Sequence, residues 1–128
     1  MKVLVDTHAL LWFLLGDSRL SATAREAIES SSNTRFLSDA SVWEISIKQS
    51  LGKLKLAEPF ESRLVAALER NVFEQLPIAR PHLFAVSRLP FHHRDPFDRL
   101  IIATAMVENL PIVTQDSQFA AYSIDVIW

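Results

Sequence analysis

Four acidic residues stand at positions where a carboxylate can do chemistry. They are spread along the chain as Asp6, Glu44, Asp98 and Asp116. Asp6 and Asp116 each follow a short apolar stretch, so both are expected at the end of a buried strand. Carboxylate oxygens are the ligands that hard cations such as Mg²⁺ and Mn²⁺ prefer. The residue types therefore predict a divalent-cation site if the fold brings the four together.

Three of these residues also have an ordinary structural explanation. Asp6 and Asp116 can each cap the turn that follows, because a carboxylate accepts hydrogen bonds from free amides at a helix start. Asp98 can be the acidic residue of a first helical turn that Asp95 caps, where the helix dipole favours negative charge. Taken singly, capping is the better explanation of each aspartate, because helix caps strongly favour this residue type.

Glu44 is different because it lies within a predicted helix, between Trp43 and Ile45. Its structural alternative is an exposed ion pair with Lys48 one turn later, which contributes only a few tenths of a kcal/mol. Chance is a poor explanation for three capping aspartates and one mid-helix glutamate at the same edge of the predicted sheet. The combination of the four residues, rather than any one of them, favours a site.

The hydrophobic pattern predicts the elements that position these residues. Strands are expected over residues 2–5, 35–38, 72–78, 111–114 and 124–128. Helices are expected over residues 7–15, 22–31 (capped by Ser21), 40–51, 59–70, 80–89 and 98–109. The alternation of strands and helices predicts an α/β fold with a mostly parallel sheet of four to five strands. Ligands of such folds bind at the carboxyl ends of the strands.

Composition sets limits on the class of protein. The 128 residues, of which 49% are hydrophobic, fit one domain over 1–128, and the absence of cysteine excludes disulfides, thiolate zinc sites and cysteine nucleophiles. Asp6 interrupts any signal-peptide core and no apolar run is long enough for a bilayer, so a cytoplasmic protein without a membrane partner is expected. The net charge of −2 lacks the basic character of most nucleic-acid-binding proteins. Bound cations would reverse the local charge at a carboxylate site.

Four motifs, in this order, resemble those of PIN-domain proteins, most closely the VapC-type toxins of bacterial toxin–antitoxin pairs. They are Val3–Thr7, Ser41–Ile45, Asp95–Ala103 and Ile112–Asp116. The resemblance covers essentially the whole chain. It implies a PIN-like three-layer α/β/α sandwich and a ribonuclease that depends on Mg²⁺ (or Mn²⁺).

In that family the metal site is formed by the residues that correspond here to Asp6, Glu44, Asp98 and Asp116. The resemblance also implies an RNA substrate cut to 5′-phosphate and 3′-hydroxyl ends, a cognate antitoxin and a homodimer. A toxin of this kind inhibits translation. Asp116 or Glu44 would help to position or deprotonate the attacking water.

The roles predicted for residues next to the motifs are less specific. Thr7 and Thr114 are expected to add hydroxyl contacts at the site, whereas His8 is given no catalytic role. Either His92, His93, Arg94 and Arg99 contact RNA phosphates, or they form a solvated loop and a helix-surface arginine, which is the favoured alternative for the histidines. No histidine metal site is expected, because two adjacent histidines cannot both face one cation in regular structure and nothing else in the sequence completes such a site. The basic stretch of Lys48, Lys53 and Lys55 is expected to be a helix exit.

The apolar content, with Trp12, Trp43 and Trp128 in a small chain, predicts exposed apolar surface for a homodimer face and a groove for an antitoxin peptide. A well-packed core that uses all three rings is the alternative.

Two other functions remain open. A phosphoryl-transfer or receiver-type domain would use Asp6 as acceptor and should carry a second acidic residue two positions later, where this chain has His8. A non-catalytic binding module would predict a broken carboxylate set, and this set is complete.

Overall fold

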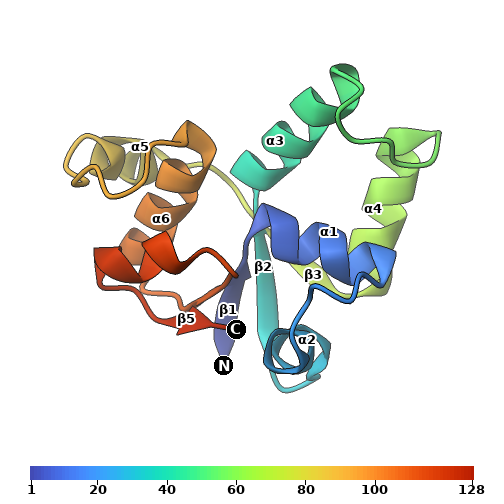
Figure 1. Ribbon diagram of the computed structural model, residues 1–128, viewed down its shortest axis with the longest axis horizontal. Helices are drawn as coiled ribbons and strands as arrows, with labels where there is room; N and C mark the ends of the chain where they lie inside the picture. The colour runs from blue at the N-terminus through green and yellow to red at the C-terminus, as the bar shows by residue number, and fades with distance from the viewer.

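The computed structural model describes residues 1–128 and contains a five-stranded sheet with helices on both faces (Figure 1). The strands are β1 (Lys2–Val5), β2 (Thr34–Ser38), β3 (Phe73–Leu76), β4 (Ile112–Val113) and β5 (Val126–Ile127). The helices are α1 (Thr7–Leu15), α2 (Ala22–Glu29), α3 (Asp39–Ser50), α4 (Phe60–Arg70), α5 (Arg80–Val86), α6 (Pro96–Glu108) and the 3₁₀ helix η1 (Ser117–Tyr122). None of the helices has both the length and the apolar character that a bilayer crossing requires.

The strands pair in the order β3-β2-β1-β4-β5, and every pairing is parallel. The chain runs outward from β1 through β2 to β3 and then returns to place β4 on the other side of β1. The strand order therefore reverses between β1 and β4, and the crevice beyond the carboxyl ends of such a pair is where open α/β sheets bind ligands. The predicted parallel sheet is confirmed.

Alternate strand residues enter two separate cores. On β1, Leu4 packs in the core beneath α5, α6 and η1, whereas Val3 and Val5 pack in the core beneath α1 to α4. Successive side chains of a strand point to opposite faces, so both faces of the sheet are covered. The three-layer α/β/α architecture follows, as predicted.

Helix α6 is the most deeply buried helix, with an unbroken run of buried residues from Arg99 to Ala105. It begins at Pro96, earlier than expected, because Asp95 Oδ1 accepts hydrogen bonds from the backbone N–H groups of Phe97 (2.8 Å) and Asp98 (3.1 Å). The predicted capping role of Asp95 is confirmed.

Some predicted boundaries were wrong for a local reason. The third strand excludes Val72, whose φ of 57° lies in the left-handed region that a strand cannot contain. The turn expected after Asp116 continues to Tyr122 as the helix η1.

Candidate functional site

Asp6 lies directly after β1 at the switch point and is 5% exposed. Its Oδ1 accepts a hydrogen bond from the Ala9 backbone N–H at 2.7 Å, so the predicted cap exists. Its Oδ2 accepts a hydrogen bond from Thr114 Oγ1, at the end of β4. Burial raises the pKa of Asp6, the two hydrogen bonds oppose that rise, and the charge of Glu44 adds to it. The carboxylate is therefore fixed in position by both strands of the switch point.

Glu44 lies on α3 and is only 3% exposed. Its Oε2 is 3.0 Å from Lys48 Nζ, so the predicted pair one turn apart exists, but the carboxylate is buried and not on the surface. Its Oε1 is buried without any hydrogen-bond partner. The N-terminal half of α3 is joined to α1 by a hydrogen bond of 2.9 Å from Thr7 Oγ1 to Ser41 Oγ. A buried carboxylate oxygen without a donor is destabilising, and a cation would remove that cost.

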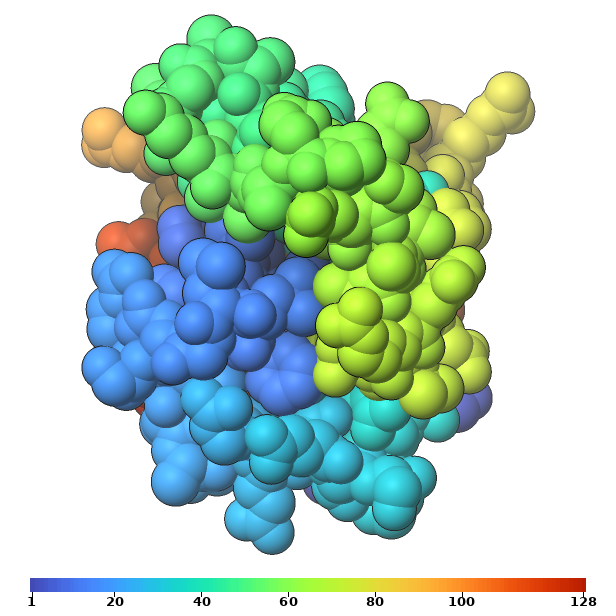
Figure 2. Space-filling view, turned by 90° about the vertical axis from the view of Figure 1, so that its right-hand side faces the viewer, coloured from blue at the N-terminus to red at the C-terminus, as the bar shows by residue number.

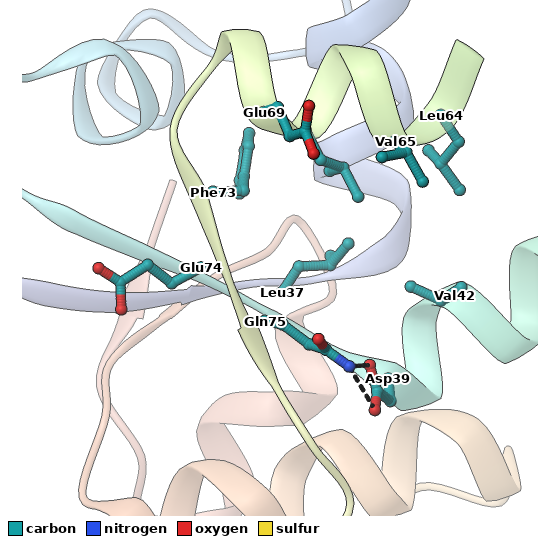
Figure 3. A pocket seen from close by; sticks show the side chains of 10 residues that line it. Leu37, Asp39, Val42, Leu64, Val65, Glu69, Phe73, Glu74 and Gln75 are labelled. Atoms are coloured by element: carbon teal, nitrogen blue, oxygen red, sulfur yellow. Dashed lines mark hydrogen bonds between the residues drawn. The ribbon is translucent and has the colours of Figure 1, made fainter. Parts of the chain in front are cut away.

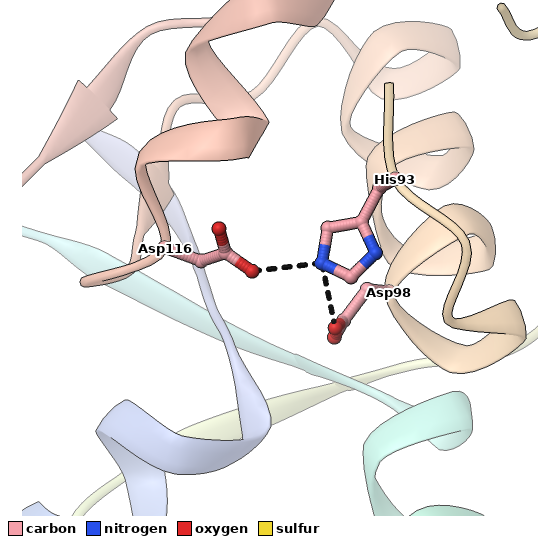
Figure 4. A group of neighbouring side chains, drawn as sticks. All are labelled: His93, Asp98 and Asp116. Carbon is pink, nitrogen blue, oxygen red and sulfur yellow. Dashed lines mark hydrogen bonds and ion pairs between the residues drawn. The ribbon is translucent and has the colours of Figure 1, made fainter. Parts of the chain in front are cut away.

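Asp98 and Asp116 lie at the starts of α6 and η1, and both carboxylates approach the same ring nitrogen of His93 (Figure 4). His93 Nε2 lies 2.7 Å from Asp116 Oδ2 and 3.1 Å from Asp98 Oδ2. The Asp116 backbone N–H also donates to Thr114 Oγ1 at 3.1 Å. Since Thr114 donates to Asp6, this threonine connects Asp116 to Asp6.

Three of the four carboxylates, those of Asp6, Glu44 and Asp98, influence one another electrostatically. Burial raises the pKa of Asp98 to about 7, and the charges of Asp95, Glu44 and Asp6 contribute to that rise. Glu44 raises the pKa of Asp6 as well. Ligand atoms of His93, Asp98 and Asp116 lie within 4.8 Å of one another, while Asp6 and Glu44 are outside this tightest group.

This donor set fits a hard divalent cation. The groups are oxygen ligands that repel one another, and one buried oxygen has no donor of its own. Mg²⁺ and Mn²⁺ take such oxygen ligands and would relieve the repulsion.

The favoured prediction for His93, an exposed residue in a solvated loop, is wrong. The prediction of a solvated loop is right for His92, which is exposed, but wrong for His93, which is 9% exposed and contacts two of the four carboxylates. Its Nδ1 accepts a hydrogen bond of 3.1 Å from the backbone N–H of Asp95, two residues later. That spacing, a histidine just before an Asp-Pro helix start, is the signal the sequence offered.

Both predictions for Arg99, a contact to RNA and a position on the helix surface, are wrong. It is 6% exposed, so it is neither a helix-surface residue nor placed to contact RNA. Its guanidinium donates to backbone carbonyl oxygens on the segment before α6, namely those of Pro90, His93, Val86 and Leu89. Arg99 therefore holds the loop that carries His93, whereas Arg94 is exposed.

Comparison with known proteins agrees with this architecture. Residues 3–124 match the model of the PIN domain family. The chain is 30% identical over 122 residues to ribonuclease VapC22 of Mycobacterium tuberculosis, an alignment that covers 94% of this chain and 91% of that protein.

Two solved structures have the same fold over 98% of this chain. The complex VapBC2 from Rickettsia felis, bound to a promoter DNA fragment, contains a chain that superposes with a TM-score of 0.73 at 18% identity over 97% of its length. VapBC-5 of M. tuberculosis, a member of the VapBC family of toxin–antitoxin systems, gives a TM-score of 0.61 at 22% identity over 97% of the matched chain. Together with the family match, the fold and the order of the motifs lead to one conclusion: the chain belongs to the PIN-domain family.

Proposed function

We propose that this chain is a Mg²⁺- or Mn²⁺-dependent endoribonuclease, the toxin of a toxin–antitoxin pair that inhibits translation. The observation that carries the metal dependence is the buried Oε1 of Glu44, which has no donor although it lies in an acidic cluster. The ribonuclease activity is supported by the VapC22 relative, and the antitoxin partner by the VapBC neighbours.

Asp6, Glu44, Asp98 and Asp116 would hold the cation. When bound, the cation supplies a more acidic, oriented water and neutralises charge on the phosphodiester in the transition state. Asp6 is held by Ala9 and Thr114, so its geometry needs little change on binding. Asp116, whose side chain is 35% exposed, is the carboxylate that an attacking water reaches most easily, and it would orient that water or accept its proton.

A receiver-type function for Asp6 is disfavoured. Asp6 is only 5% exposed, and a phosphoryl acceptor must be reached by the donor molecule. The residue two positions later is His8 and not a second acidic residue.

An apolar groove between α4, β3 and the start of α3 would receive a segment of the antitoxin (Figure 3). Figure 2 looks onto the face that contains α4 (lime) beside α1 (blue). The groove floor and walls are apolar, formed by Leu37, Val42, Leu64, Val65, Leu68 and Phe73. Acidic side chains on the rim, Asp39, Glu69 and Glu74, would select a segment with basic residues beside apolar ones.

A homodimer would use exposed apolar surface on α3 and α6. Trp43 is 55% exposed and packs edge-on against Phe97, with ring centroids 4.8 Å apart. Trp12 and Trp128 are partly buried against each other, so of the three tryptophans only Trp43 provides such a surface. Sedimentation velocity should detect a dimer that Trp43→Glu dissociates, and a monomeric wild type would contradict the proposal. A cytoplasmic location accords with an RNA substrate.

RNA cleavage by the purified protein tests the function. Cleavage should require Mg²⁺ or Mn²⁺, stop on addition of EDTA and leave 5′-phosphate ends. Asp6→Asn and Asp98→Asn should each reduce the rate at least about 10³-fold, because loss of a metal ligand removes several kcal/mol of transition-state stabilisation. Glu26→Gln, an exposed change from acid to amide on α2, is the matched control and should cleave RNA as the wild type does. Undiminished cleavage by either aspartate variant would contradict the assignment, and DNA cleavage without RNA cleavage would change the substrate.

A further inference from the structure

His93 lies between two of the four carboxylates, and its two ring nitrogens have different partners. Nδ1 faces the backbone N–H of Asp95 at 3.1 Å. Nε2 faces oxygens of Asp116 at 2.7 Å and of Asp98 at 3.1 Å (Figure 4). One side of the ring therefore faces a donor and the other side faces acceptors.

This arrangement fixes the tautomer of the ring. A backbone N–H can only donate, so Nδ1 must offer its lone pair to Asp95, and a neutral imidazole then carries its hydrogen on Nε2. That hydrogen is donated to Asp116 Oδ2, while Asp98 Oδ2 lies 3.1 Å from the same nitrogen without a hydrogen bond to it. The imidazole is thus a donor to the acidic cluster.

The same contact disfavours His93 as a direct metal ligand, although its Nε2 is close enough to the carboxylates to be one. A cation on Nε2 needs the lone pair of that nitrogen, so the hydrogen would move to Nδ1. Two N–H donors, those of the ring and of Asp95, would then face each other at 3.1 Å. The backbone around the cap of α6 would have to change to relieve this contact.

Further contacts fix both the backbone and the ring of His93. The His93 backbone N–H donates to Tyr122 Oη at 2.7 Å, and the same hydroxyl donates to the Pro90 carbonyl oxygen at 2.8 Å. The Phe119 ring packs edge-on against the imidazole, with centroids 5.7 Å apart. These contacts therefore fix the position of His93 between the start of α6 and the start of η1.

We propose that His93 is a positioning residue whose Nε2–H holds the carboxylate of Asp116 beside that of Asp98, in the place that a divalent cation requires, without binding the cation itself. The metal part of this role rests on the proposed function. Hydrogen bonds to metal-binding carboxylates orient them, and their loss lowers metal affinity or activity about 10- to 100-fold.

The tautomer can be measured directly by long-range ¹H–¹⁵N correlation spectra of protein labelled at histidine. His93 should have its hydrogen on Nε2 both without metal and with saturating Mg²⁺. His82 is an internal reference, because its Nδ1 also accepts from a backbone N–H, that of Ala79 at 3.0 Å, while Nε2 faces Glu108 at 2.7 Å. The His93→Gln variant assigns the signals. A hydrogen on Nδ1 of His93, or its loss from Nε2 when Mg²⁺ binds, would overturn the proposal.

Calorimetric titration with Mn²⁺ then separates positioning from ligation. His93→Ala should weaken Mn²⁺ binding about 10- to 100-fold. His93→Gln should recover most of the affinity, because its amide N–H can donate to the same Asp116 carboxylate. A direct imidazole ligand would not be rescued in this way. His92→Ala, an exposed change in the same loop, should bind as the wild type does.

Equal affinities of the Ala and Gln variants would overturn the proposal. If His93→Ala does not fold, the tautomer of His93 and the Mn²⁺ affinity of His93→Gln still test the proposal. A wild type that neither binds Mn²⁺ nor cleaves RNA refutes the proposed function itself. A wild type that does both, beside a His93→Ala variant that binds Mn²⁺ equally well, refutes only the role of His93.

Discussion

The candidate site has two halves that differ in burial and in how they are held. The inner pair, Asp6 and Glu44, is almost fully buried, at 5% and 3% exposure. The outer pair, Asp98 and Asp116, has side chains that are 20% and 35% exposed. The inner pair includes a carboxylate oxygen without any donor, whereas His93 lies against both members of the outer pair. A bound cation would therefore stabilise the inner half most, whereas a substrate can reach the outer half.

The largest effect on stability is expected at Arg99, which holds the outer half only. Arg99→Met would leave the carbonyl oxygens of His93 and Leu89 without a donor, whereas those of Pro90 and Val86 would each keep a second donor. Each buried acceptor left unpaired costs on the order of 1 kcal/mol or more, so the free energy of unfolding should fall by about 2–4 kcal/mol. Denaturant unfolding measures this loss. The matched control Arg94→Met, which is exposed, should stay within about 0.5 kcal/mol of the wild type. Equal stability of both variants would mean that the outer half does not depend on Arg99.

The pH dependence of the stability of the metal-free protein tests the outer half of the site separately. Burial and neighbouring charges raise the pKa of Asp98 to about 7, so between about pH 4 and pH 7 the folded protein holds a proton that the unfolded chain has released. Stability contributed by this group is complete below about pH 4 and is lost as the pH rises through about 7. The metal-free wild type should therefore melt at a lower temperature at pH 8 than at pH 5.

Asp98→Asn is the matched test, because its side chain has nearly the same shape and does not titrate. Its melting temperature should change less over this range than that of the wild type and should exceed it at pH 8. A wild type that becomes more stable as the pH rises toward 8 would contradict the raised pKa.

A smaller effect is expected at the inner half. Glu44→Gln removes a buried charge and should raise the stability of the metal-free protein by about 1 kcal/mol, measured by thermal unfolding without metal. Lys48→Met is the matched control, because it removes the partner and leaves the Glu44 charge, so it should lower stability. A Glu44→Gln variant less stable than the wild type would show that the Lys48 pair outweighs the burial of the carboxylate.

Much of the inner half could be predicted from the sequence. The cap at Asp6 is a local feature, because the carboxylate accepts from an amide three residues later. The position of Glu44 in a helix follows from the apolar run around it. Its burial does not follow from local pattern, and its pair with Lys48 looks the same in sequence whether it is exposed or buried.

The outer half was harder to predict because its contacts join distant segments. His93 reaches Asp116, 23 residues later, and its backbone N–H reaches Tyr122. Arg99 was misread for a related reason, since a helical arginine followed by apolar residues gives no sign that its guanidinium folds back onto the preceding loop. Periodicity reports which face of an element is apolar, but it does not report which polar side chains become buried between elements.

Mn²⁺ binding by isothermal titration calorimetry, on the wild type beside Asp98→Asn, tests the central claim most directly. The wild type should bind Mn²⁺, and the bound ion should raise its melting temperature, because a ligand that binds only the folded state stabilises it. Asp98→Asn should lose most of both effects while remaining folded. Equal binding and equal melting shifts in the two proteins would show that the metal binds elsewhere and that the four carboxylates do not form the site.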